Sequence, residues 1–201
     1  MSLQPFFDSV PRITFHDPLA EFLGAAHDGR LEYAYGDAVR FAGHSCPTVA
    51  MAYALTVKGL QALYPDELPE RGAIIASFPQ AAAEGVTGVV SGVVGFLTGA
   101  TETTGFKGIG GRFVRRGLMQ FGSTVTGAFR LSCAQGGEVA LDAQLDRVPA
   151  PAQTWELLAR CLKDEASGAE RDEFRALWQG RVRRLLVDHW NDADVWQVSL
   201  R

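Results

Sequence analysis

The chain has 201 residues, of which 47% are hydrophobic and 21% are charged, and its formal net charge is −4. This is the composition of an ordinary soluble protein with enough residues for one good-sized core. The negative charge and the lack of a basic tract argue against nucleic-acid binding. Three widely spaced cysteines do not resemble a disulfide framework, so we expect reduced thiols and a cytoplasmic protein.

The first third of the chain predicts a short helix, a short strand and a long helix. Residues 1–14 contain two prolines and are expected to be irregular. Asp17 and Pro18 are typical of a helix cap and first turn, in a helix that ends by Gly29. A short strand is expected over residues 31–35, and Gly36-Asp37 is expected to end it. The long helix runs over residues 47–63, and apolar residues on most of its sides predict that it is buried.

The middle of the chain alternates strands with a glycine-rich segment. Residues 73–78 have the pattern of a buried strand. The apolar helix expected over residues 85–100 is shorter than the ~20 residues that span a bilayer, so we expect no membrane segment. Gly88 and Gly92 stand four residues apart on this helix, as do Gly95 and Gly99, and this spacing predicts tight helix packing within the chain or across a dimer.

The remaining elements are a hairpin and two helices. Residues 125–133 and 138–146 read as two strands joined by a glycine-containing turn. After Pro149 and Pro151, two apolar stripes with helical spacing are separated by Ser167-Gly168. The predicted fold is therefore α+β: an antiparallel or mixed sheet packed against long helices, with two C-terminal helices. We expect one domain over residues 1–148 and a helical extension over residues 149–201 that packs on it.

The stretch Gly43-His44-Ser45-Cys46-Pro47 carries the clearest chemical signal. Proline is favoured in the first turn of a helix, so Cys46 is the expected cap residue. The positive end of the helix dipole favours an anion there, such as a thiolate. In an extended segment, His44 and Cys46 point the same way. The pair is suited to serve as two soft metal ligands, or as a nucleophile and a base.

This stretch resembles the signature of the FmdE family, which is named after a component of formylmethanofuran dehydrogenase and in which His-Gly-His-x-Cys-Pro-Gly opens a long helix. Two later segments resemble that family as well, namely Leu97-Thr98-Gly99-Ala100-Thr101 and Gly105-Phe106-Lys107-Gly108. The likeness covers roughly residues 38–146. It departs from the family pattern at Ala42, Thr48 and Ala100, which stand in place of a histidine, a glycine and a cysteine, and the paired cysteines of a zinc ribbon are missing.

The resemblance implies an intertwined α+β homodimer with a transition-metal site near the signature. An imidazole and a thiolate suit zinc, and also iron or nickel. A catalytic zinc site normally takes three protein ligands and a water. We expect His44 and Cys46 as ligands, with His16 as the third. Ordinary structural roles, such as a helix-cap histidine and a buried cysteine, are the alternative for each of them.

Other candidates lie on the glycine-rich helix and the loop after it. Glu84 interrupts an apolar run and is a candidate general base or further ligand, although an exposed acid in a first helical turn is the simpler interpretation. The Thr- and Gly-rich loop over residues 98–113 is a candidate ligand-contacting loop. We expect its Thr101, Lys107, Gly108 and Arg112 to contact a bound small molecule, with the two cations holding a carboxylate or phosphate.

Three functions stay open at this point. The first is an enzyme that acts on a small carbonyl or one-carbon metabolite through a metal-bound water, with Glu84 moving protons. The second is a non-catalytic metal carrier, sensor or accessory component of a redox enzyme. The third, a pterin- or cofactor-binding module of one-carbon metabolism, rests on the family name alone. The expected partners are a small-molecule ligand and a second copy of the chain, with neither nucleic acid nor membrane.

Overall fold

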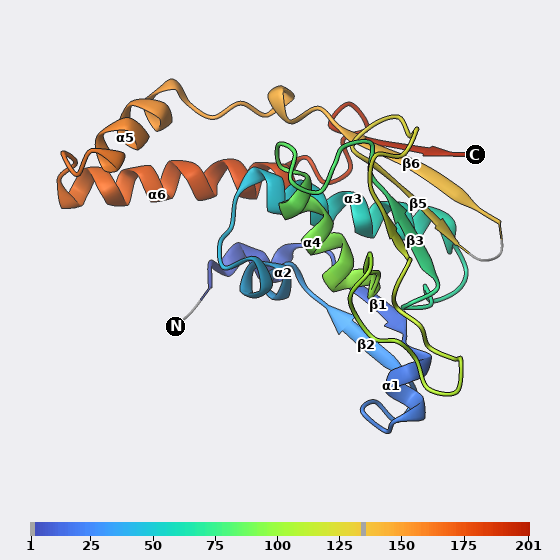
Figure 1. Cartoon of the computed structure of the whole chain (residues 1–201). Coiled ribbons are helices and arrows are strands. Elements are labelled where there is room, and N and C mark those ends of the chain that lie inside the picture. Colours follow the sequence, from blue (N-terminus) through green and yellow to red (C-terminus); the bar gives the residue numbers. More distant parts are fainter. Residues whose placement is uncertain (1–2, 134–135) are drawn as a thin grey trace.

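The computed structural model describes residues 3–133 and 136–201, and it has the predicted α+β fold. A five-stranded sheet covers one side of the long helix α3, and helices α2 and α4 cover the other (Figure 1). In chain order the elements are η1 (Pro5–Ser9), β1 (Ile13–His16), α1 (Pro18–Phe22), β2 (Arg30–Tyr33), α2 (Tyr35–Ala42), α3 (Pro47–Leu63), β3 (Ile74–Ser77), α4 (Thr87–Thr98), β4 (Met119–Gln120), β5 (Phe129–Cys133), β6 (Glu138–Ala143), η2 (Leu145–Arg147), α5 (Ala152–Leu162), α6 (Gly168–Arg183), η3 (Arg184–Asp188) and β7 (Trp196–Leu200).

The main sheet has the strand order β4-β3-β5-β6-β7. Strands β3 and β4 are parallel, and the other neighbouring pairs are antiparallel, so the sheet is mixed as predicted. Strands β1 and β2 form a separate antiparallel pair, in which Ile13 lies opposite Tyr33. The predicted hairpin is present as β5 and β6, while residues 134–135 of its turn lie outside the described residues.

Helix α3 forms the centre of the hydrophobic core, as the sequence predicted. Ten of its residues are buried, and it packs against α2, α4 and the strands β5, β6 and β7. The buried Tyr53 hydroxyl lies 2.8 Å from the Pro11 carbonyl oxygen and 3.2 Å from that of Tyr33, so it ties the chain before and after the small sheet to the core. The helix begins at Pro47 and ends at Leu63, which are the bounds that the flanking prolines indicated.

Three elements differ from the prediction. Gly36 and Asp37, expected only to end the short strand, lie in the first turn of helix α2, where the Asp37 carboxylate accepts a hydrogen bond from the Ala34 N–H (2.9 Å). The C-terminal extension, expected to be entirely helical, ends in strand β7, which pairs with β6 along the edge of the main sheet. Helix α1 is also shorter than expected, because it ends at Phe22.

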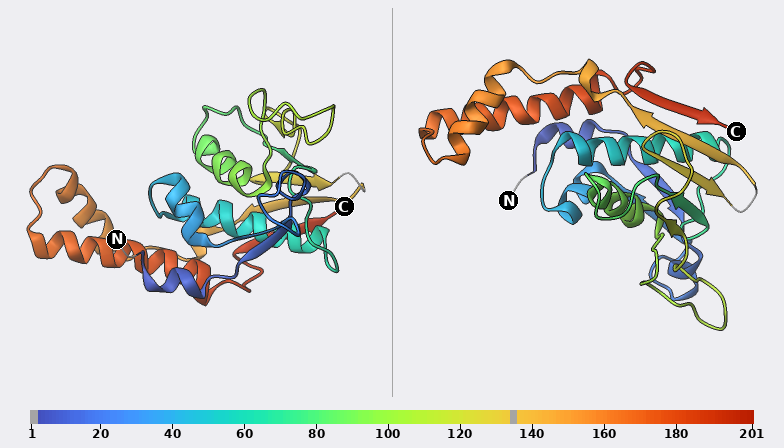
Figure 2. Two further views of the ribbon diagram at one scale, coloured as in Figure 1. Left: turned by 90° about the horizontal axis from the view of Figure 1, so that it is seen from below. Right: turned by 45° about the horizontal axis from the view of Figure 1, so that its top comes forward.

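Helices α5 and α6 form a hairpin that projects from the rest of the molecule (Figures 1 and 2). Ser167 caps α6 by accepting a hydrogen bond from the Glu170 N–H, and the Glu170 carboxylate accepts one from the Ser167 N–H in return. The other end of α6 packs near the beginning of α3, so the C-terminal region reaches the signature stretch. Over the described ranges, no helix combines the length and the apolar character needed to cross a membrane.

Candidate metal-binding residues and their surroundings

Cys46 caps helix α3 in the way that the sequence predicted. Its backbone is extended, Pro47 occupies the first turn, and the Sγ atom accepts a hydrogen bond from the Val49 N–H at 3.5 Å. The side chain is half-buried and the thiol is free of any disulfide. The sulfur therefore lies at the positive end of a buried 17-residue helix, where a negative charge is stabilised.

His44 lies just outside the same helix and is exposed. Its Nδ1 is 3.0 Å from the Ala42 carbonyl oxygen. A carbonyl oxygen can only accept, so Nδ1 carries the proton and Nε2 is left with a free lone pair in the neutral ring. A histidine that ligates a metal commonly has its second nitrogen bonded to a backbone carbonyl in this manner. In this tautomer His44 has Nε2 available to a metal ion.

Ser45, between the two candidate ligands, is held by the C-terminal helix α6. Its carbonyl oxygen accepts hydrogen bonds from Trp178 Nε1 (3.0 Å) and Gln179 Nε2 (3.2 Å). Its hydroxyl donates to Gln179 Oε1 (3.0 Å), so the Tyr35 hydroxyl, 2.9 Å away, donates to Ser45 Oγ. Burial raises the pKa of Tyr35 against a smaller opposing effect of this hydrogen bond, which keeps the phenol protonated as a donor. Four side-chain contacts therefore fix the peptide between His44 and Cys46.

A pocket of about 380 Å³ adjoins this peptide. Ser45 lines it together with Val39, Phe7 and the α6 side chains Phe174, Trp178 and Gln179. Its wall is mainly apolar, and Arg175 of α6, which is paired with Asp172, lines it as well. Neither His44 nor Cys46 lines it.

The structure does not bring the predicted third ligands to the signature. His16 ends strand β1, where its Nε2 lies 2.9 Å from Glu21 Oε2 and its backbone N–H donates to Pro69. Glu84 is exposed in the turn before α4, and its carboxylate accepts a long hydrogen bond from the Ala81 N–H (3.4 Å). Over residues 3–133 and 136–201, no group of three or more His, Cys, Asp or Glu side chains is arranged to hold a metal ion.

The loop predicted to hold a ligand is organised by its own backbone. Ile109 and Arg112 exchange two backbone hydrogen bonds of 3.0 Å around Gly110 and Gly111, both of which have positive φ. This is the pattern of a type I′ hairpin turn, which explains the two glycines without a ligand. The Thr101 hydroxyl lies near the carbonyl oxygens of Thr104 and Arg115, so it bonds within the loop.

The remaining loop candidates differ in where they point. Lys107 is exposed and forms no ion pair with any described residue. Gly108 is half-buried and lies against the backbone of Arg112, where a side chain would collide. Arg112 extends over the rings of Phe113 (4.7 Å) and Phe22 (5.9 Å) and lines a pocket beside α1. Of these three, only Arg112 lines a described pocket.

A buried ion cluster beside α1 was missed by the sequence reasoning. Asp17 caps α1 through Oδ1, which accepts from the N–H groups of Leu19 (3.0 Å) and Ala20 (3.2 Å). The same carboxylate binds Arg115 Nη2 (2.7 Å) and Arg71 Nη1 (3.1 Å). Asp17 and Arg115 are buried, and Arg71 is mostly so. The cap was predictable, but the two arginines lie 54 and 98 residues away and no local pattern marks them.

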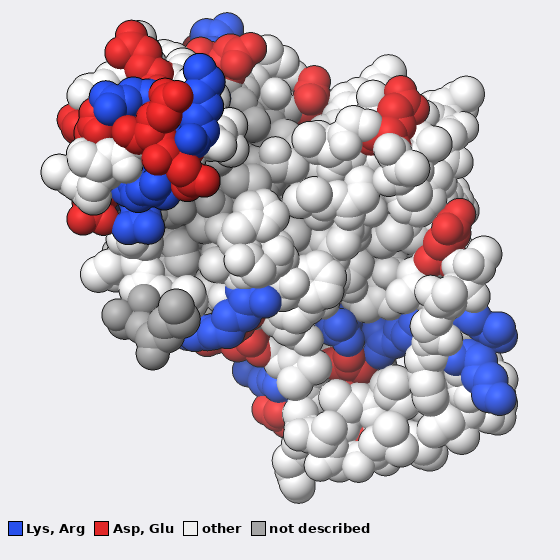
Figure 3. All heavy atoms as spheres, turned by 60° about the vertical axis from the view of Figure 1, so that its left-hand side comes forward, with Lys and Arg blue, Asp and Glu red and all other residues white. Residues whose placement is uncertain are grey.

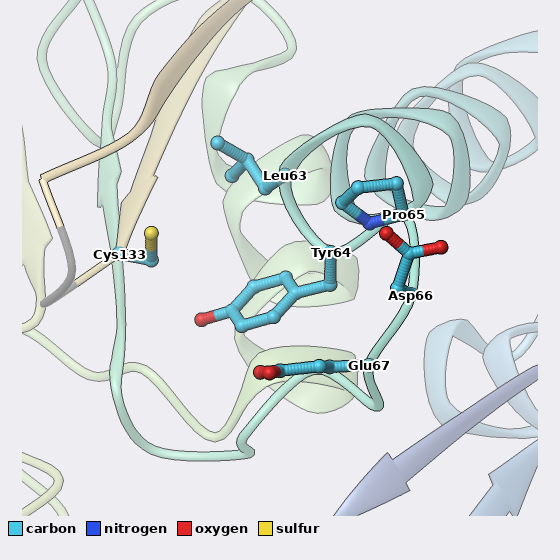
Figure 4. A pocket seen from close by; sticks show the side chains of 6 residues that line it. All are labelled: Leu63, Tyr64, Pro65, Asp66, Glu67 and Cys133. Carbon is cyan, nitrogen blue, oxygen red and sulfur yellow. The ribbon is translucent and has the colours of Figure 1, made fainter.

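The other two cysteines occupy different settings. Cys133 lies beside a pocket of about 240 Å³ with the buried Tyr64 hydroxyl and the Glu67 side chain (Figure 4). The Cys133 thiol lies 3.6 Å from the Gly137 carbonyl oxygen, and the Tyr64 hydroxyl has no hydrogen-bond partner among the described residues. Burial, and then the proximity of Cys133, raise the pKa of Tyr64. Cys161 lies on α5, away from both pockets.

Comparisons with protein-family models and with curated proteins found no match to this sequence.

Proposed function

We propose that this chain is a transition-metal-binding protein of the FmdE-like kind, with His44 and Cys46 as ligands and zinc as the expected metal. The observation that carries the proposal is the hydrogen bond from His44 Nδ1 to the Ala42 carbonyl oxygen, which leaves Nε2 free two residues before the half-buried Cys46 in the chain. The donor types suit zinc, and iron or nickel as well.

One chain offers too few ligands to complete a zinc site by itself. Zinc in proteins takes four ligands, and a catalytic site keeps three from the protein. One described chain offers two, since His16 is bonded to Glu21 and no third group completes the set. We therefore expect the remaining ligands to come from outside this chain, and a second copy would supply another His44 and Cys46.

The surface next to the signature supports the second copy. Phe41, three residues before His44, is 53% exposed and stacks on Phe96 of α4 with ring centroids 4.9 Å apart. Val86, which precedes α4, and Val89, in its first turn, are also exposed, and the Phe41 ring lies against Gly92 in the middle of the helix. Figure 3 shows a broad stretch of surface without charged atoms between the charged group at its upper left and the Lys and Arg atoms lower down. An uncharged face with exposed aromatic and aliphatic side chains is suited to packing against its own copy, which would bring two signatures toward each other.

A site built from two histidines and two cysteines would be closed to substrate. A closed tetrahedral set is typical of structural or storage sites, whereas an open position is needed for catalysis. This favours a metal carrier, sensor or accessory component over an enzyme acting on a small carbonyl or one-carbon compound. If a position stays open, the metal would supply Lewis acidity to a bound carbonyl.

The test is metal analysis of the purified protein beside His44→Ala and Cys46→Ala. His27→Ala is the matched control, because His27 is also exposed but lies near α1. We expect both signature variants to lose zinc while the control keeps it. Equal metal content in the unmodified chain and all three variants would contradict the assignment of His44 and Cys46 as ligands.

The stoichiometry and the mass in solution separate the closed site from the open one. One zinc per two chains, together with a dimer in light scattering that dissociates in chelator, supports the shared site. Val89→Lys places a charge on the apolar α4 face and should give monomers that bind zinc weakly. One zinc per chain, with a cobalt-substituted spectrum that shows a water ligand, would instead favour the enzyme.

A further inference from the structure

We propose that the pocket between α1 and the loop over residues 101–118 binds an oxyanion, the phosphate or carboxylate group of a small metabolite, through Arg71, Arg112 and Arg115. The pocket has a volume of about 510 Å³, which is within the range of small-molecule sites. It lies by α1, at the lower end of the molecule in Figure 1 and away from the start of α3. The inference therefore does not depend on the metal site.

The pocket has more positive than negative charge on its walls. All three arginines line it, and Glu70 is its one acidic lining residue. Asp17 lies behind the wall and is shared between Arg71 and Arg115, so it balances only one of those two cations. Arg112 forms no ion pair with the residues that the structure describes. Figure 3 shows Lys and Arg atoms gathered where the lower lobe meets the main body.

Arg115 has an unused donor directly behind this wall. Its side chain is 7% exposed, and Nη1 is buried without a hydrogen-bond partner among the described residues. Nη1 lies against Gly72, which also lines the pocket, and a Cβ at Gly72 would collide with it. Buried charged donors are nearly always paired, so an unpaired one marks a place where an acceptor is missing. An oxyanion oxygen at the Gly72 wall would supply that acceptor.

Arg112 is held in position by its neighbours on the loop. The type I′ turn at Gly110 and Gly111 presents it, and Phe113, which follows, has a positive φ of 62°. A non-glycine residue in this conformation is strained, and such strain concentrates at functional sites. The Phe113 ring lies under the Arg112 guanidinium and also lines the pocket. The loop thus fixes a cation at the mouth of the pocket and an apolar ring beside it.

The chemistry of the wall selects the class of ligand. Guanidinium groups present paired donors that match the oxygens of a phosphate or a carboxylate. The pocket is larger than one such group, and Phe113 and Val114 provide apolar contact for the rest of the molecule. We infer a ligand with an anionic head, seated on the arginines, and an apolar or ring-shaped body.

Calorimetric titration of the full chain with inorganic phosphate and with malonate, at constant ionic strength adjusted with chloride, tests the proposal. We expect millimolar or tighter binding of at least one of them. Arg112→Gln should weaken it about tenfold, as expected for the loss of one charge-assisted contact. Arg116→Gln is the matched control, because Arg116 is exposed in the same loop and does not line the pocket. It should bind like the unmodified chain.

Each outcome of the titrations either supports or contradicts the oxyanion site. Preference for phosphate or for malonate names the head group, and either supports the site. No binding at millimolar concentration, or equal weakening in Arg112→Gln and Arg116→Gln, would overturn it. Arg115→Lys keeps the charge beside Asp17 but removes the fork, so it should bind weakly while melting as a folded protein. His44→Ala and Cys46→Ala should leave oxyanion binding unchanged, which separates this site from the proposed metal site.

Discussion

The beginnings of α1 and α3 share a local sequence pattern and differ in what surrounds it. Each helix starts with a polar cap followed by proline, Asp17-Pro18 in one and Cys46-Pro47 in the other. The Asp17 carboxylate is buried and accepts from two backbone N–H groups and two arginines. The Cys46 sulfur accepts from one N–H and stays half-exposed. The first cap is saturated by protein donors, whereas the second remains available to a ligand from outside.

The difference shows that the residue before the proline sets the start of the helix, and distant residues set its chemical role. Arg71 reaches Asp17 from before β3 and also donates to the carbonyl oxygens of Leu97 (2.9 Å) and Phe96 (3.0 Å) at the end of α4. It therefore joins the positive end of one helix to the negative end of another. Near Cys46, the distant residues Trp178 and Gln179 donate to the Ser45 carbonyl oxygen and not to the Cys46 sulfur.

The largest expected loss of stability comes from removing the charge of Asp17, the cap of α1. Asp17→Asn leaves two mostly buried arginines without their carboxylate, and breaking a buried ion pair on one side costs about 3–5 kcal/mol. Urea unfolding should show this loss. Glu21→Gln, an exposed acid on the same helix, should cost less than about 1 kcal/mol. A loss below that level in Asp17→Asn would mean that the cluster is not buried in solution.

The same substitution should also change the dependence of stability on pH. Burial alone would raise the pKa of Asp17, but hydrogen bonds from the Ala20 N–H and Arg71, with the charge of Arg115, lower it below its ordinary value. The unfolded chain therefore binds this proton first on acidification. The contribution is fully present above about pH 5 and is lost as the pH falls through the folded-state pKa, at up to about 1.4 kcal/mol per pH unit. Asp17→Asn should lack this part of the acid transition.

A smaller loss is expected when the space for Arg115 is filled. Gly72 has a φ of +92°, and a Cβ there would collide with Arg115 Nη1. Gly72→Ala should lower the free energy of unfolding by about 2–4 kcal/mol, from backbone strain and overpacking together. Gly24→Ala is the matched control, because Gly24 also has a positive φ but has nothing within 4 Å of a Cβ. It should show only the backbone part, about 1–2 kcal/mol. Equal losses would argue against close packing of Arg115 on Gly72.

The smallest loss of stability should come from removing one of the hydrogen bonds to Ser45, the residue before the Cys46 cap. Trp178→Phe removes one donor from the Ser45 carbonyl oxygen while Gln179 keeps the other, at a cost of about 1 kcal/mol. We expect Cys46 to react faster with iodoacetamide, because the peptide before it is less firmly held. Peptide mass spectrometry would follow Cys46 against Cys161 in the same sample.

Local patterns in the sequence were enough for the elements that have clear ends. Helix α3 was predicted to its terminal residues, because a proline marks each end and its apolar pattern is unbroken. Helix α2 was missed because Gly36 and Asp37 read as a break. In the fold Gly36 is buried near Leu3, and Asp37 pairs with Arg40 (2.7 Å) within the first two turns. Tertiary packing outweighed the weak helix preference of glycine here.

Long-range contacts account for the rest of what was missed. In strand β7 only Trp196 is buried, so the strand lacks the alternation that marks a half-buried strand, and its pairing with β6 defines it. The Cys46 cap could be predicted because cap and helix are adjacent. Asp17 could be predicted as a cap too, but its arginines could not. His16 was expected at the metal site because it precedes a helix, and that same position places it beside Glu21.

The hydrogen bonds from Trp178 and Gln179 to Ser45 can form only late in synthesis of the chain. Trp178 is made 133 residues after Ser45, and the ribosome adds about 5–20 residues per second, so the interval is on the order of ten seconds. Throughout that interval the Ser45 carbonyl oxygen, next to Cys46, lacks its Trp178 and Gln179 donors. The nascent chain therefore carries a more accessible thiol than the finished protein does. Any factor that loads or protects this cysteine would act most easily before α6 folds against α3.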